Sequence, residues 1–128
     1  NITLSKDKPN FNSLKRAIRI SKLYKLVSKY AKKTKHRIKN SGIDLSGGQR
    51  QRIGIARSLY INRNIIFLDE TTNALDEKTE AEILSSLKNE FKNKTVFIIS
   101  HSKDLRKYVD RIIKIKNKKI TVTNSNAR

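Results

Sequence analysis

Two adjacent acids, Asp69 and Glu70, follow a short apolar run at residues 65–68. A continuous apolar run of this length is typical of a strand that is buried in a parallel sheet. The residues after such a strand lie at the carboxyl edge of the sheet, where ligands bind in α/β folds. One carboxylate there could hold Mg²⁺ through water, and the other could accept a proton from an attacking water. Taken alone, the pair is equally compatible with two solvated acids or with a helix N-cap.

A serine and two glycines, Ser46, Gly47 and Gly48, stand directly ahead of a helix predicted at 49–60. Backbone N–H groups at a helix N-terminus attract anions such as phosphate, and glycines leave those groups accessible. The Ser46 hydroxyl would add a donor, and Gln49 could orient the loop. Two glycines alone also fit an ordinary turn, so a functional interpretation depends on the residues that come after them in the chain.

Three further polar residues need to be considered as candidates. His101 follows a second apolar run at 95–99, where it could reach a ligand at the sheet edge or only a local backbone group. Asp76 stands just before a predicted helix and is a favourable N-cap. His36 lies in a basic loop, and nothing around it indicates a function.

These residues must be positioned by alternating helices and strands. Periodicity and apolar runs predict the following elements in chain order: a helix from an N-cap at Asn12 or Ser13 to about 33, a loop over 34–48, a helix over 49–60, a strand at 65–68, a helix over 77–91, a strand at 95–99, a short helix near 103–109, and strands at 111–116 and 119–123 joined by a tight turn at Asn117-Lys118. The first two strands are apolar enough to be buried on both faces. The order predicts an α/β sheet with right-handed crossovers.

The charge is strongly basic, with 30 Lys and Arg against 11 Asp and Glu and a formal net charge of +19 on 128 residues. Residues 1–40 hold thirteen bases and one acid, whereas residues 64–93 hold seven acids and three bases. Nucleic acid or an anionic membrane surface are the first partners to consider for such a chain. However, the bases are spread through every segment without the interleaved aromatic residues of a single-strand-binding surface. A lysine-rich solvated surface explains them better.

Composition also excludes several classes of protein. No apolar run approaches the ~20 residues of a membrane-spanning helix. Cysteine is absent, which removes disulfides, thiolate metal sites and cysteine nucleophiles. Methionine is absent too, which leads to the hypothesis that the chain is a fragment.

From Leu45 onwards the chain resembles the ATP-binding-cassette (ABC) ATPases. Residues 45–49 read L-S-G-G-Q, which is that family's signature motif, and residues 51–57 match the Q-R-I-x-I-A-R that comes after it. The apolar strand ending in Asp-Glu resembles the Walker B motif. Residues 73–76 resemble the D-loop, with Asn73 in place of the usual serine. His101 stands where the family has its switch histidine. The resemblance is strongest over 42–116 and weak over 5–40.

The resemblance implies a role for each residue that carries it. Glu70 would be the catalytic glutamate, Asp69 would hold Mg²⁺ through water, and His101 would contact the γ-phosphate of ATP. Asp76 would belong to the D-loop. The signature would bind ATP held by a partner domain, through Leu45, Ser46, Gly47, Gly48 and Gln49. ATP and Mg²⁺ are therefore the implied ligands.

Within the family, Thr71 and the Asn73-Ala74-Leu75-Asp76 segment are more similar to exporters and flippases than to importers. This implies ATP hydrolysis coupled to export or flipping of a lipid-like or hydrophobic substrate. The implied location is the cytoplasmic face of the membrane. The implied partners are a second nucleotide-binding domain, identical or not, and a transmembrane domain. No nucleic acid is expected.

None of the four glycines begins the pattern G-x-x-x-x-G-K-[ST], so a Walker A phosphate loop is missing, and no Q-loop candidate is present. The expected fold is therefore α/β, the C-terminal half of a P-loop NTPase-like ABC nucleotide-binding domain. Residues 1 to about 60 would form part of the helical subdomain with the signature, and about 61–128 the second half of the ATPase core. Alone, the chain is expected to be inactive and to leave apolar surface exposed beside its strands.

Two alternatives stay open. The first is a soluble ABC ATPase that acts on nucleic acid or ribosomes, which the net charge mildly favours. The second is a non-catalytic basic binding module descended from an ABC domain. Glu70 and His101 argue against the second alternative, because a protein that only binds needs neither.

Overall fold

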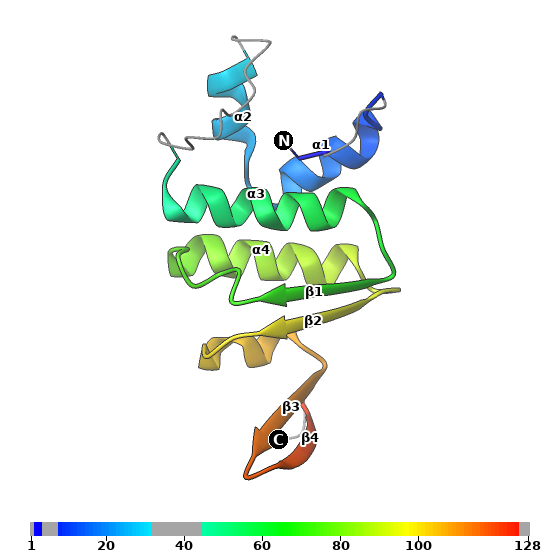
Figure 1. Cartoon of the computed structure of the whole chain (residues 1–128), viewed down its shortest axis with the longest axis vertical. Helices are drawn as coiled ribbons and strands as arrows, with labels where there is room; N and C mark the ends of the chain where they lie inside the picture. Colours follow the sequence, from blue (N-terminus) through cyan, green and yellow to red (C-terminus); the bar gives the residue numbers. More distant parts are fainter. Residues whose placement is uncertain (1, 4–7, 32–44, 126–128) are drawn as a thin grey trace.

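The computed structural model describes residues 2–3, 8–31 and 45–125, arranged in successive layers (Figure 1). Two helices lie on one side, α1 (Phe11–Ile20) and α2 (Tyr24–Ala31), and α1 packs against α3 (Gly47–Tyr60) and α4 (Glu77–Glu90). A sheet lies beyond the helices, and a separate hairpin forms the far end of the molecule (Figure 1). Residues 34–44 of the loop expected over 34–48, with His36 among them, fall outside the described residues.

The sheet has the parallel topology that the sequence predicts. Strand β1 (Ile65–Asp69) pairs in parallel with β2 (Thr95–Ile99), and helix α4 makes the crossover between them. Asp69 lies opposite Ile99, so the carboxyl ends of both strands meet at one edge of the sheet. The acids after β1 and the histidine after β2 are thereby brought to the same edge.

The last part of the chain forms the predicted hairpin. A short 3-10 helix, η1 (Lys103–Tyr108), packs against α4 and precedes β3 (Arg111–Lys116) and β4 (Lys119–Asn124), which are antiparallel. Asn117 and Lys118 both have positive φ, at 50° and 60°. Positive φ at both central residues is the geometry of a two-residue turn whose twist matches the strands it joins.

One core holds the helices and the sheet together. Helix α3 contributes Ile53, Ala56 and Leu59, and α4 contributes Ile83, Leu84 and Leu87, followed by Phe91. The buried apolar side chains in the described part of the chain are Ala17, Ile20, Leu23, Ile53, Ile55, Ala56, Leu59, Ile66, Leu68, Ile83, Leu84, Leu87, Phe91 and Leu105. The core thus fixes α3 and α4 relative to β1, and these three elements carry most of the candidate site.

The prediction of one long N-terminal helix was wrong. The chain leaves the helix after Ile20 and restarts at Tyr24, with Lys22 at a φ of 55°. The buried Ser21 hydroxyl donates to the Ala17 carbonyl at 2.6 Å and thereby satisfies one end of α1. The N-cap is also different: Asn10, rather than Asn12 or Ser13, accepts the Ser13 N–H at 3.0 Å.

The strands leave apolar surface exposed, as expected for this chain alone, and only one face of β1 is buried. In β1 only Ile66 and Leu68 are buried, and they face the helices. Phe67 on the opposite face is 67% exposed and stacks on Phe97, with ring centroids 4.8 Å apart. The helices cover one face of the sheet, and the described residues leave the other face uncovered.

Candidate active site

The signature residues form the capped start of α3. Ser46 is the N-cap: its Oγ accepts the Gln49 N–H at 3.2 Å, and Gln49 Oε1 accepts the Ser46 N–H at 3.1 Å. This reciprocal pair is a capping box. Gly47 and Gly48 therefore open the helix instead of preceding it, which corrects the predicted start at residue 49. The Leu45 carbonyl accepts a bond from Arg50.

The arrangement leaves this helix end able to bind an anion. The Ser46 hydroxyl acts as acceptor in the cap, so its own hydrogen is not used there. The first turn of α3 contains no acid that would repel an anion. The unpaired N–H groups of a first helical turn carry partial positive charge.

Glu70 and His101 lie together at the carboxyl edge of the sheet. His101 Nε2 is 3.2 Å from Glu70 Oε1, although the two side chains are 90% and 50% exposed. The Glu70 N–H donates to the Ile99 carbonyl at 2.9 Å, which extends the strand pairing by one residue. Asp69 is the last residue of β1 and is exposed. The three predicted polar residues of this edge are thus positioned by β1 and β2.

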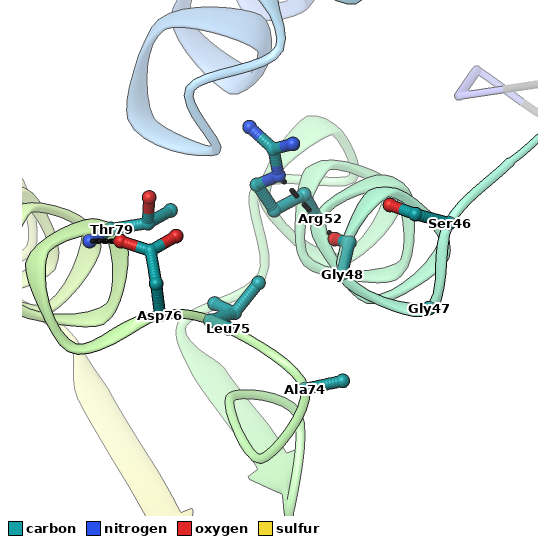
Figure 2. Close-up of a pocket in the computed structure, with 8 residues that line it drawn as sticks. All are labelled: Ser46, Gly47, Gly48, Arg52, Ala74, Leu75, Asp76 and Thr79. Atoms are coloured by element: carbon teal, nitrogen blue, oxygen red, sulfur yellow. Dashed lines mark hydrogen bonds between the residues drawn. The ribbon is translucent and has the colours of Figure 1, made fainter.

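A hollow of about 340 Å³ separates the start of α3 from the start of α4 (Figure 2). Its lining residues come from both helix starts and from the segment before α4: Ser46, Gly47, Gly48, Arg52, Ala74, Leu75, Asp76 and Thr79. Asp69, Glu70 and His101 do not line it. The predicted site residues therefore fall into two groups, one at the helix starts and one at the sheet edge.

Asp76 caps α4 at the wall of this hollow. Its Oδ1 accepts the Thr79 N–H at 2.9 Å, drawn as a dashed line in Figure 2. Hydrogen bonds from Thr79, together with the nearby Arg52 guanidinium, lower the pKa of Asp76 below its ordinary value of 3.8. The capping role that the sequence left open for Asp76 is confirmed.

Gly48 allows α3 to approach the segment at 73–75. A Cβ on Gly48 would lie 2.8 Å from the Ala74 carbonyl oxygen and 3.3 Å from a methyl group of Leu75. A Cβ on Gly47 would lie 3.6 Å from the Ala74 Cβ, which is ordinary contact. Of the two signature glycines, Gly48 is the one that this approach requires.

Two residues next to the signature were missed as site residues. Gln51 bonds to residues 70 and 74, and Arg52 Nη1 donates to the Lys22 carbonyl at 2.9 Å, where α1 gives way to α2. Figure 2 shows Arg52 reaching from α3 toward that connection. Both residues fall within the matched stretch at 51–57, and Gln51 is three residues after Gly48, on the same helix face. That spacing was the available signal.

The carboxylates at the sheet edge fit a magnesium site that substrate phosphates and water complete better than a site enclosed by protein ligands alone. Within the described ranges, no cluster of three or more His, Asp or Glu side chains could enclose a metal ion. Mg²⁺ is commonly held by one or two carboxylates together with substrate phosphates and water. Asp69, exposed beside Glu70, matches that kind of donor set.

No helix in the described part of the chain is long and apolar enough to span a membrane.

Comparisons with known proteins agree on one family. The sequence model of the ABC transporter family matches residues 3–73. The chain is 36% identical over 120 residues to the ATP-dependent lipid A-core flippase of Desulfotalea psychrophila, covering 94% of this chain and 21% of that protein. It is 31% identical over 127 residues to ABC transporter B family member 14 of Arabidopsis thaliana, covering 99% of this chain and 10% of that protein.

A solved structure of a bacterial Atm1-family ABC exporter with ATP bound is similar in fold, with a TM-score of 0.83 and 25% identity. The similarity covers 97% of this chain and 22% of that one. The chain therefore spans about a fifth or less of the length of these relatives. It belongs to the ABC transporter family, and its α/β fold is that of part of the ATPase domain of an ABC exporter.

Proposed function

We propose that the chain is the C-terminal half of a nucleotide-binding domain that hydrolyses ATP to export or flip a lipid-like or hydrophobic substrate. The observation that carries the proposal is the contact between Glu70 and His101 at the carboxyl edge of a parallel sheet. The names of the relatives, an exporter and a lipid A-core flippase, support the transport direction and the substrate class. The longer protein that this proposal implies is called the parent protein.

The proposed reaction is in-line attack of water on the γ-phosphate of ATP. The Glu70 carboxylate would accept the proton of that water, and His101, 3.2 Å from it, would hold the γ-phosphate beside the attacking water. Bound Mg²⁺ would neutralise negative charge on the phosphates, and Asp69 would hold it through water. These residues need a phosphate-binding loop from the other half of the domain.

The start of α3 would serve a second ATP molecule. The Ser46 hydroxyl and the first N–H groups of α3 would bind the γ-phosphate of ATP presented by a partner nucleotide-binding domain. The separation of the site residues into two groups supports this division of labour between two nucleotides. The proposed partners are thus a second nucleotide-binding domain and a transmembrane domain, at the cytoplasmic face of a membrane.

The second candidate function is a soluble ABC ATPase that acts on nucleic acid or ribosomes. The observation that favours it is the net charge of +19. Binding through phosphate contacts weakens steeply as salt rises. Sequence-specific binding of the parent protein to DNA or RNA that persists at high salt would favour this candidate over transport.

The test of the leading proposal is Glu70→Gln in the parent protein. The amide has the shape of the carboxylate but is a far poorer base, so ATP binding should persist while turnover stops. The measurements are ATP affinity and steady-state ATP turnover. Glu77→Gln makes the same chemical change at an exposed residue of α4 and should leave turnover intact. Glu70→Gln protein that keeps more than about a tenth of the normal kcat, a loss under ~1.4 kcal/mol, would contradict the assignment.

A further inference from the structure

Gln51 joins the signature helix to the residues around Glu70. Its Oε1 accepts the Ala74 N–H at 2.9 Å, and its Nε2 donates to the Glu70 carbonyl at 3.4 Å. Gln51 lies on α3, three residues after Gly48. One side chain therefore bonds two backbone groups that lie 19 and 23 residues further along the chain.

These two partners require one orientation of the amide. The Ala74 N–H is a donor and must face the oxygen, whereas the Glu70 carbonyl is an acceptor and must face the nitrogen. The reversed amide would place donor against donor and acceptor against acceptor. No other uncharged side chain of this length offers both groups, so a glutamine suits this position specifically.

The backbone of Glu70 is the part of the site that needs support. Its φ is 45°, in the left-handed region that is unfavourable for a residue with a Cβ. The Glu70 N–H bonds to Ile99 on β2, and its carbonyl accepts from Asn73 at 3.4 Å as well as from Gln51. The Glu70 backbone is therefore restrained by hydrogen bonds to three parts of the chain: strand β2, the turn after β1, and α3. The bond from α3 is the one that Gln51 provides.

The contact at Gly48 makes this bridge possible. Because Gly48 has no side chain, the Ala74 carbonyl oxygen can lie only 2.8 Å from the position that a Cβ would occupy. Gly48 and Gln51 lie on the same face of α3 and both meet Ala74. The start of α3 and the segment after Glu70 are thus in direct contact at two points.

We propose that Gln51 is a positioning residue for ATP hydrolysis: its amide holds the Glu70 backbone in its left-handed conformation and ties it to the signature helix. The inference rests on the proposed function, since it assumes that Glu70 is the base. Gln51 itself touches no reacting atom. Its loss should misplace the Glu70 carboxylate without weakening the binding of ATP.

The test uses three variants of the parent protein. Gln51→Met keeps the length of the side chain and removes both polar groups. Gln51→Glu keeps an oxygen for the Ala74 N–H but has no donor for the Glu70 carbonyl. Ser58→Ala, on the same helix, removes a hydroxyl that bonds only back to the Gly54 carbonyl among the contacts described, and is the matched control. The measurements are kcat and KM for MgATP, with circular dichroism to compare the folded fraction.

The expected result is a fall in kcat of about ten- to a hundredfold for both Gln51 variants, because small misplacements of catalytic groups have effects of this size. KM should change less than about threefold, and Ser58→Ala should match the normal protein. Gln51→Glu is the decisive variant, since a purely structural tie to Ala74 would be rescued by its oxygen. A kcat within about twofold of normal in Gln51→Glu or Gln51→Met, or a rise in KM matching the fall in kcat, would overturn the inference.

The same assays separate this inference from the proposed function. If Glu70→Gln keeps turnover, Glu70 is not the base and the proposed function fails. If Glu70→Gln stops turnover while Gln51→Met does not, the proposed function stands and only the role of Gln51 is refuted.

Discussion

At the scale of single residues, the candidate site depends on close backbone approach more than on strong side-chain contacts. The Glu70 and His101 side chains are 50% and 90% exposed, and contacts between polar side chains this exposed contribute little to stability. Their significance is geometric, because two parallel strands deliver them to one edge. Gly48, in contrast, is tightly packed: its backbone lies so close to the Ala74 carbonyl that a side chain would have no room.

Gly48→Ala should therefore destabilise the protein, whereas Gly47→Ala should not. A new Cβ at 48 must displace the Ala74 backbone, and overpacking of this kind costs about 1–3 kcal/mol. At 47 the Cβ meets only the Ala74 Cβ at 3.6 Å, and alanine favours the helix. The free energy of unfolding in urea measures both. Equal values for the two variants would contradict this account of the signature glycines.

At the scale of elements, the site is held by two capped helices, α3 and α4, that begin on opposite sides of the same hollow. Ser46 caps the first and Asp76 the second. Arg52 connects this region to the break between α1 and α2 through the Lys22 carbonyl. The close approach of Gly48 to Ala74, together with the Gln51 bond to the Ala74 N–H, joins the start of α3 to the segment that leads into α4.

Asp76→Ala should lower the unfolding temperature by a few degrees, because the N-cap of α4 is lost. Asparagine also caps helices well, so Asp76→Asn should keep most of the stability that the cap provides. The pKa of Asp76 is lowered in the folded state, so its charge stabilises folding above pH 3.8 and this contribution is lost as the pH falls through the lower folded value. Thermal unfolding from pH 2 to 7 measures both effects. Asp76→Asn should lack this part of the acid dependence. An unchanged acid profile in Asp76→Asn would contradict the assignment.

Most elements were predictable from the sequence because their signals are local. The apolar runs at β1 and β2, the N-cap of α4 and the turn at Asn117-Lys118 each need only a few adjacent residues. The break after Ile20 is not evident from the sequence, because Ile18 and Leu23, five residues apart, can both be assigned to the apolar face of one long helix. That step marks the position where the helix ends.

The candidate site could be predicted only in part. The motif residues are recognisable by type and spacing, and the strand order places Glu70 beside His101. The bonds of Gln51 could not be predicted, since they depend on how closely α3 approaches the segment at 73–75. The exposed apolar surface beside the strands was predictable, because both runs are apolar on two faces while the segments that would cover the second face are missing from the sequence pattern.

At the scale of the whole molecule, two apolar surfaces remain uncovered by the described residues. One is the outer face of the sheet, with Ile65, Phe67, Phe97 and Ile99, and the other is a face of the hairpin, with Ile113, Ile115, Ile120 and Val122. Exposed apolar surface of this kind commonly marks a place where another part of a protein packs. On the proposed function, the other half of the nucleotide-binding domain covers the sheet.

The most direct measurement of the central claim is ATP turnover by the 128-residue chain, alone and after addition of the N-terminal half of the domain in trans. Alone, the chain should show no turnover above background, because Glu70 and His101 have no phosphate-binding loop to present ATP to them. Turnover should appear when the other half is added and should disappear again when the chain carries Glu70→Gln. Turnover by the chain alone that Glu70→Gln abolishes would contradict the account, since it would require a phosphate site within these 128 residues.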